Sequence, residues 1–204
     1  MTLLDLDRLD ATPLSKEPYE FVMVPNFVRP EAIGPIRDAY PRIDQPGSFP
    51  VSKVTFGKGF ANLLKALEGP DFRHAIEGKF GVDLSGRPTM VTVRGNCGPR
   101  DGGIHTDSRS KIVTVLLYLN EPWEAQGGRL RLLRSSTDLE DYALEVPPEA
   151  GLLLAFRRSD RSFHGHKPYI GPRRVVQLNW VANSGHVLWD LMRHRLSAWI
   201  KRAA

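Results

Sequence analysis

Cysteine is almost absent from this sequence, which has only Cys97 among its 204 residues. A lone cysteine excludes an internal disulfide bond and a zinc site made of several thiolates. We therefore expect a reducing, cytoplasmic environment. Any metal site must use histidine and carboxylate ligands, which favour iron or manganese. No base is apparent near Cys97, so we expect this thiol to be a bystander rather than a nucleophile.

Long hydrophobic runs are missing as well. No stretch approaches the roughly 18 consecutive apolar residues of a membrane-spanning helix, so we expect no transmembrane segment. The opening residues, MTLLDLDRLD, carry acids inside a short apolar stretch, which is unlike a secretory signal. The net charge is +5, but the basic residues are scattered, apart from a local excess in RHRLSAWIKR. With no nucleic-acid-binding motif, we expect no nucleic-acid partner.

The chain is long enough for one domain with a substantial core, and we interpret residues 1–204 as a single domain. Residues 1–89 hold a strand near 20–28 and then helices that start at Pro30 and over 60–69 and 71–81. Residues 39–58 are rich in proline, glycine and serine and predict an irregular segment. Residues 90–182 form short, alternating, β-branched segments separated by turn residues, which indicate a sandwich or barrel. Residues 183–204 predict an amphipathic helix. The expected fold is mainly β with flanking helices (α+β).

A candidate metal site lies in the β-rich part. In the sequence GGIHTDSRS, His105 and Asp107 are two residues apart, so an extended chain points both side chains the same way. His164 follows much later, in SDRSFHGHKPY. Two imidazoles and one carboxylate on one face of a metal leave the other face open, which is the arrangement of non-haem iron(II) oxygenases. An HxD triplet alone is weak evidence, and the surrounding pattern has to support it.

That pattern resembles the 2-oxoglutarate/Fe(II)-dependent oxygenase superfamily and, within it, the prolyl-4-hydroxylase-like branch. The resemblance covers about residues 90–182. It rests on four segments in the family's order: HTD, the following strand KIVTVLLYLN, the Gly-Gly-x-Leu strand in QGGRLRLL, and the closing run VPPEAGLLLAFRRSDRSFHGHKPYIGPRRVVQLNWV. It implies a double-stranded β-helix, a jelly roll related to cupins. It also implies iron(II) held by His105, Asp107 and His164, with 2-oxoglutarate and dioxygen as cosubstrates.

The family also implies a cation for the distal carboxylate of 2-oxoglutarate, nine to eleven residues after the distal histidine. Both Arg173 and Arg174 fit that spacing. A guanidinium suits the task because it grips a carboxylate through two parallel hydrogen bonds. Strand alternation favours Arg173. If it points inward, so do Val175, Gln177 and Asn179, while large apolar residues pack under the helices: Val176, Leu178 and Trp180.

Three further residues carry alternatives. Tyr118 matches a family tyrosine that supports the same carboxylate, and alternation groups it with Ile112, Thr114 and Leu116; an ordinary core tyrosine is the other reading. His166 could replace His164 as the distal ligand, although His164 better matches the family's spacing. Arg94 either lines the pocket and meets an anionic substrate or is a solvated strand end. The remaining histidines are expected on helices, as surface residues: His74, His186 and His194.

The resemblance implies hydroxylation of an unactivated C–H bond with release of succinate and CO2. Asp107 favours this over halogenation, since halogenating relatives replace the metal carboxylate with a small residue. The alternative is a metal-binding jelly roll that is non-catalytic or of the cupin type. The substrate is not specified by the sequence, and we expect a small or carrier-linked molecule. The basic C-terminal segment could pair with another subunit, so a homodimer remains an open alternative.

Overall fold

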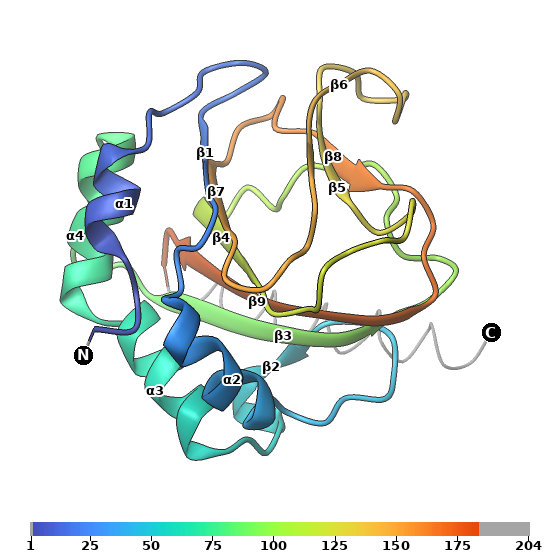
Figure 1. The fold of residues 1–204 in the computed structure, drawn as a ribbon. Helices are drawn as coiled ribbons and strands as arrows, with labels where there is room; N and C mark the ends of the chain where they lie inside the picture. Colours follow the sequence, from blue (N-terminus) through green and yellow to red (C-terminus); the bar gives the residue numbers. More distant parts are fainter. Residues whose placement is uncertain (1, 184–204) are drawn as a thin grey trace.

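The computed structural model describes residues 2–183, in which two antiparallel β-sheets face each other and helices cover the larger sheet (Figure 1). The helices are α1 (Leu6–Ala11), α2 (Pro30–Asp38), the 3₁₀ turn η1 (Val51–Lys53), α3 (Lys58–Leu67) and α4 (Pro70–Phe80). The strands are β1 (Phe21–Val24), β2 (Phe49–Pro50), β3 (Thr89–Cys97), β4 (Lys111–Tyr118), β5 (Leu130–Leu133), β6 (Tyr142–Val146), β7 (Leu153–Arg157), β8 (His164–His166) and β9 (Gly171–Val181). Of the helix expected over 183–204, all but residue 183 lies outside the described residues.

Helices α2, α3 and α4 form where the sequence predicted them. One face of α3 buries its apolar residues at helical spacing: Phe60, Leu63, Leu64 and Leu67. Helix α4 begins with Pro70 in its first turn, where a missing N–H costs little, and ends at Gly81, whose φ of 60° is the left-handed conformation glycine adopts freely. None of the helices in residues 2–183 is long and apolar enough to cross a membrane.

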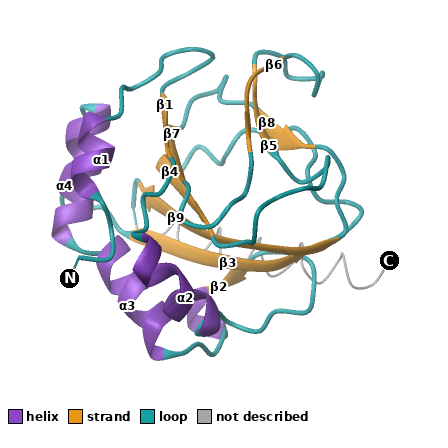
Figure 2. Ribbon diagram, in the orientation of Figure 1, coloured by secondary structure: helices purple, strands orange, loops and turns teal. Residues whose placement is uncertain are grey.

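The larger sheet has the strand order β1-β7-β4-β9-β3-β2 and the smaller one β6-β5-β8. Strands β1 and β2, from the N-terminal part of the chain, pair with β7 and β3, so that part both covers the large sheet and extends it. Figure 2 shows the helices gathered against one side of the β3–β9 layer and the small sheet on the other. The architecture is mainly β with flanking helices, as predicted from the sequence.

Alternation along the central strand β9 separates two apolar layers. Val176, Leu178 and Trp180 belong to the cluster that contains the core residues of the helices. Val175 belongs to the second cluster, between the two sheets, together with Leu130 of β5. The inner faces of the two sheets therefore enclose the space in which a site can form.

Strands β2, β6 and β8, the 3₁₀ turn η1 and the short helix α1 were not predicted, and β2 and η1 lie in the segment 39–58 that was expected to be irregular. Strand β8 is only His164–His166, too short to show alternation, and β6 is Tyr142–Val146, with most of its residues half-buried. Helix α1 is held by a local cap in which the Asp5 carboxylate accepts from the Arg8 backbone N–H. Strands β6 and β8, by contrast, depend on pairing across the fold more than on their own sequence.

Candidate metal centre

Two histidines meet because the backbone pairs them. The His105 N–H donates to the His164 carbonyl at 3.0 Å, and the His164 N–H donates to the His105 carbonyl at 2.9 Å. This isolated antiparallel bridge attaches the HTD segment to strand β8 and brings the ring centroids to 4.4 Å. Backbone hydrogen bonds thus join ligands that lie far apart in the sequence.

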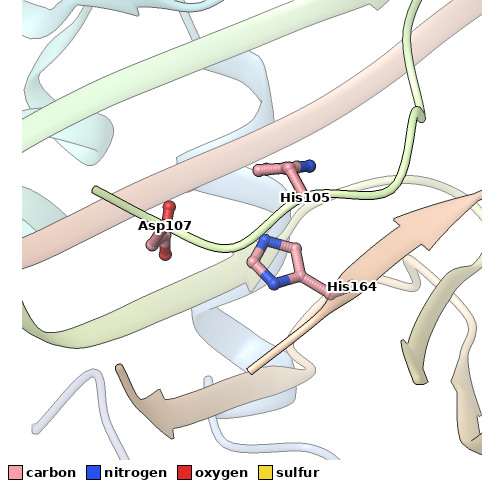
Figure 3. Close-up of side chains that lie close together, drawn as sticks. All are labelled: His105, Asp107 and His164. Atoms are coloured by element: carbon pink, nitrogen blue, oxygen red, sulfur yellow. The ribbon is translucent and has the colours of Figure 1, made fainter. Parts of the chain in front are cut away.

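Asp107 completes the cluster. One potential ligand atom from each of His105, Asp107 and His164 lies within 4.8 Å of the others. Figure 3 shows His105 and Asp107 coming from one stretch of chain and His164 from the neighbouring strand, with the three side chains close together. His164 and Asp107 are buried and His105 is exposed, so the cluster is open on one side. In residues 2–183 no other group of this kind occurs.

The two imidazoles present the right nitrogen to a metal. Nδ1 of His105 lies 2.9 Å from the Gly103 carbonyl, and Nδ1 of His164 lies 3.0 Å from the Ser162 carbonyl. A carbonyl only accepts, so each Nδ1 carries the proton and each Nε2 keeps a lone pair. Burial lowers the pKa of His164 to about 4, against the opposing charge of Asp107, so this ring is neutral at neutral pH.

The Asp107 carboxylate is buried and fixed by two donors. Burial alone would raise its pKa, but the Lys111 ammonium, together with His164 and the hydrogen bonds, holds the pKa well below the usual range. Lys111 Nζ donates to Oδ1 at 2.5 Å, and Thr114 Oγ1 donates to Oδ2 at 2.5 Å. The cluster therefore offers two imidazoles, each with its Nε2 available, and one full carboxylate, a donor set that suits iron(II).

A cavity of about 190 Å³ lies beside this cluster and is lined by its three residues and by Arg173. Arg173 is buried, its Nε donates to the Gly128 carbonyl at 2.8 Å, and its guanidinium lies 5.5 Å from the centre of the Tyr118 ring. Arg174 faces the other way, with its guanidinium 5.7 Å from the centre of the Tyr40 ring. Of the two arginines, Arg173 is thus the one that can reach a ligand beside the metal cluster.

The Tyr118 hydroxyl is the unusual polar group of this site. It is fully buried, and no described residue accepts a hydrogen bond from it. Burial raises the pKa of Tyr118, and the nearby Arg173 guanidinium offsets this in part, so the hydroxyl keeps its proton at neutral pH. A buried hydroxyl without an acceptor is costly and calls for an explanation. A carboxylate held between Arg173 and Tyr118 would provide the missing acceptor.

His166 and Arg94 also line the cavity. His166 is buried, its Nδ1 lies 2.8 Å from the Lys167 carbonyl, and it stands outside the three-residue cluster. Arg94 pairs with Asp101 at 2.8 Å and donates to Ser48 Oγ at 3.2 Å, so it is part of the cavity wall rather than a solvated strand end. His74 lies exposed on α4, while His186 and His194 fall outside the described residues.

The sequence reasoning missed Lys111 and misplaced Ile112. Simple alternation put Ile112 on the face of Thr114 and Tyr118, but it packs against the cluster under the helices. The reason is an irregularity in the pairing of β4 with β9, in which Lys111 opposes Val181 and Val113 opposes Trp180. The extra residue forms a β-bulge, which no pattern in the segment KIVTV predicts. Thr114 could have been found by alternation, since it lies four residues before Tyr118.

Comparison with known proteins agrees with this geometry. Residues 95–182 match the family model described as the 2OG-Fe(II) oxygenase superfamily. No curated protein sequence matches the chain. Similar solved structures include a Pseudomonas putida prolyl-4-hydroxylase (19% identity, 87% of this chain and 93% of that chain, TM-score 0.55). Others are a Burkholderia pseudomallei oxidoreductase of the 2OG-Fe(II) oxygenase family (12%, 88% and 91%, 0.55) and a Trichoplax adhaerens prolyl hydroxylase in complex with a hypoxia inducible factor peptide fragment (20%, 86% and 86%, 0.53).

These structures share the fold, a double-stranded β-helix core, and the matched segment contains the whole candidate metal cluster. The resemblance found in the sequence is therefore confirmed. Iron(II), 2-oxoglutarate and dioxygen are the cofactor and cosubstrates of the family. Residues 95–182 thus match the 2OG-Fe(II) oxygenase superfamily, and this match together with the fold indicates an iron(II)- and 2-oxoglutarate-dependent dioxygenase.

Proposed function

We propose that His105, Asp107 and His164 hold the iron, that Arg173 and Tyr118 hold the distal carboxylate of 2-oxoglutarate, and that the enzyme hydroxylates a small or carrier-linked substrate. The observation that carries the cosubstrate assignment is the buried Tyr118 hydroxyl, which finds no acceptor among the described residues and lies beside Arg173. When bound, iron and 2-oxoglutarate supply the oxidising step: 2-oxoglutarate and dioxygen become succinate and CO2, and one oxygen atom enters the substrate.

The protein's own contribution is to bind and orient. The Nε2 lone pairs of His105 and His164 and one Asp107 oxygen would hold the metal. Arg173 Nε is anchored on the Gly128 carbonyl, which leaves the two terminal nitrogens to grip a carboxylate. Apolar side chains on the cavity wall keep water from the reacting atoms: Leu116, Leu130, Phe156 and Val175.

A polar substrate is supported by the remaining cavity wall. Four polar side chains line the cavity: Ser48 just before β2, Thr92 and Arg94 of β3, and Gln177 of β9. Such side chains offer hydrogen bonds that a hydrocarbon substrate could not use. A prolyl residue of a peptide is the competing substrate class, because prolyl hydroxylases are among the similar structures. The proposal also includes a cytoplasmic location and a single domain over residues 1–204.

The proposal is tested by substrate-dependent succinate release, measured with a panel of small polar molecules, carrier-linked acyl and sugar compounds, and prolyl peptides. Asp107→Ala should abolish release, whereas Asp71→Ala, at an exposed acid in the first turn of α4, should leave it near wild type. Substrate-dependent succinate release in Asp107→Ala would contradict the assignment of Asp107 as a metal ligand. Iron binding with no 2-oxoglutarate-dependent chemistry would favour a non-catalytic or cupin-type metal protein. Light scattering on the full chain tests whether it forms a homodimer.

A further inference from the structure

Lys111 is a buried ammonium beside the metal cluster. Its side chain is 6% exposed, and Nζ lies 2.5 Å from Asp107 Oδ1. Burying a cation is costly unless it is paired, and Asp107 provides the pair. Asp107 is also the one anionic ligand of the proposed iron site. A single carboxylate therefore faces both the metal and a lysine.

The fold places Lys111 there through a local departure from regular strand geometry. In an unbroken strand Lys111 would share the face of Val113 and Val115, which pack in the apolar cluster under the helices. The bulge at Ile112 turns Lys111 to the inner face, where it lines the cavity with Thr114. Bulges that re-aim one side chain are frequent beside active sites.

Holding the carboxylate in place does not by itself require a lysine. Thr114 Oγ1 already donates to Asp107 Oδ2 at 2.5 Å, and that hydroxyl lies 3.1 Å from Asn179 Oδ1. Lys111 adds to this orienting bond a whole positive charge. Another cation close to Asp107, Arg158, donates to the Asp107 backbone carbonyl at 3.2 Å, but its charge is balanced by Asp160 at 2.7 Å.

We propose that Lys111 stabilises the ferrous over the ferric state of the bound iron by keeping a fixed positive charge next to Asp107. The inference rests on the proposed function, since it needs the iron to be bound by Asp107. Two neutral imidazoles and one carboxylate give the ligand set a charge of −1, which Lys111 offsets. A neighbouring positive charge disfavours the more highly charged metal ion, so the Fe(III)/Fe(II) potential rises.

This effect bears on the oxidation of bound iron(II) by dioxygen when no substrate is present. In that side reaction Fe(II) gives one electron to dissolved dioxygen, which leaves as superoxide, and Fe(III) remains. A raised potential makes this electron transfer less favourable. Lys111 is accordingly a positioning residue that acts through Asp107 and protects the resting enzyme.

The test is a redox titration of the iron-loaded protein with soluble mediators, followed by the electron paramagnetic resonance signal of high-spin ferric iron. Lys111→Gln keeps a neutral donor near Asp107 and removes the charge. We expect it to shift the Fe(III)/Fe(II) equilibrium toward ferric iron by at least about tenfold, or about 59 mV for one electron. Lys111→Arg should stay close to wild type, because it keeps the charge. Thr114→Val removes the other donor without a formal charge and should shift the equilibrium less than Lys111→Gln.

An unchanged potential in Lys111→Gln, or a shift no larger than that of Thr114→Val, would overturn the inference. A Lys111→Arg variant that behaves like Lys111→Gln would also overturn it, since charge would then not be the cause. Lys111→Met is a second neutral variant if Lys111→Gln does not fold. Failure of both to bind iron would show that Lys111 serves metal binding instead. The proposed function fails separately, if wild-type protein with iron(II) does not bind 2-oxoglutarate.

Discussion

Replacing Arg173 should weaken 2-oxoglutarate binding far more than replacing its neighbour Arg174. Arg173 is 5% exposed, and Nε is tied to the Gly128 carbonyl, so the two terminal nitrogens are positioned for a bidentate contact. Removing one partner of a buried, hydrogen-bonded charge pair costs about 2–5 kcal/mol. That corresponds to a Kd for 2-oxoglutarate raised roughly 30-fold to several thousand-fold. Arg173→Lys should fall between wild type and Arg173→Gln, because it keeps the charge but loses the fork.

The assay is anaerobic titration of the iron(II)-loaded protein with 2-oxoglutarate, followed by the weak visible charge-transfer band of the chelated keto acid. Arg174→Gln is the matched control, since its guanidinium lies over Tyr40 and away from the cavity. Melting temperatures of all variants separate lost binding from lost folding. The reasoning fails if Arg174→Gln weakens binding as much as Arg173→Gln, or if folded Arg173→Gln binds like wild type.

Three further predictions concern the same site. Tyr118→Phe should raise the Kd for 2-oxoglutarate roughly 2- to 13-fold, because it removes one hydrogen bond of about 0.5–1.5 kcal/mol. The melting temperature of the metal-free protein should stay the same or rise, because the variant removes a buried hydroxyl that has no described acceptor. A lower melting temperature would show that this hydroxyl is satisfied in the metal-free fold. Gly102→Ala should lower the melting temperature, because Gly102 has a φ of 99° and an added Cβ would lie 2.4 Å from the His166 carbonyl oxygen, whereas Gly103→Ala has nothing within 4 Å; equal melting temperatures would contradict this. Manganese(II) at 100 times its Kd should stabilise the wild-type protein by about 2.7 kcal/mol, seen as a thermal shift that EDTA reverses and that His164→Ala lacks; a full shift in His164→Ala would remove this residue from the ligand set.

Much of the fold follows from local patterns. Apolar spacing in α3 and the Gly81 cap of α4 are encoded within a few residues, and β-branched alternation gives β3, β4 and β9. The short strands β6 and β8 lack such patterns, because their backbone hydrogen bonds are made with partners distant in the sequence. Strand β8, for example, forms by pairing with β5 and by bridging to His105. Helix α1 has only six residues, too few for a clear apolar period.

The candidate metal cluster was predictable for two reasons. His105 and Asp107 are only two residues apart, and the position of His164 matches that of the distal histidine in the family that the sequence resembles. The direction of Arg173 also follows from alternation, since β9 places Val176 and Trp180 under the helices. Lys111 could not be found in the same way. Its direction depends on the bulge in β4, which arises from register with β9 and not from its own neighbours. The tautomers of the two ligand histidines likewise depend on carbonyls that only the folded chain brings into place.

The central claim is that His164, with His105 and Asp107, holds an iron(II) ion that 2-oxoglutarate chelates. The most direct measurement is anaerobic addition of iron(II) and then 2-oxoglutarate to metal-free wild-type, His164→Ala and His166→Ala proteins, watching the charge-transfer band. We expect the band in wild type and in His166→Ala, and its loss in His164→Ala. A band that survives in His164→Ala but not in His166→Ala would assign the distal ligand to His166, and no band in wild type would contradict cosubstrate chelation altogether.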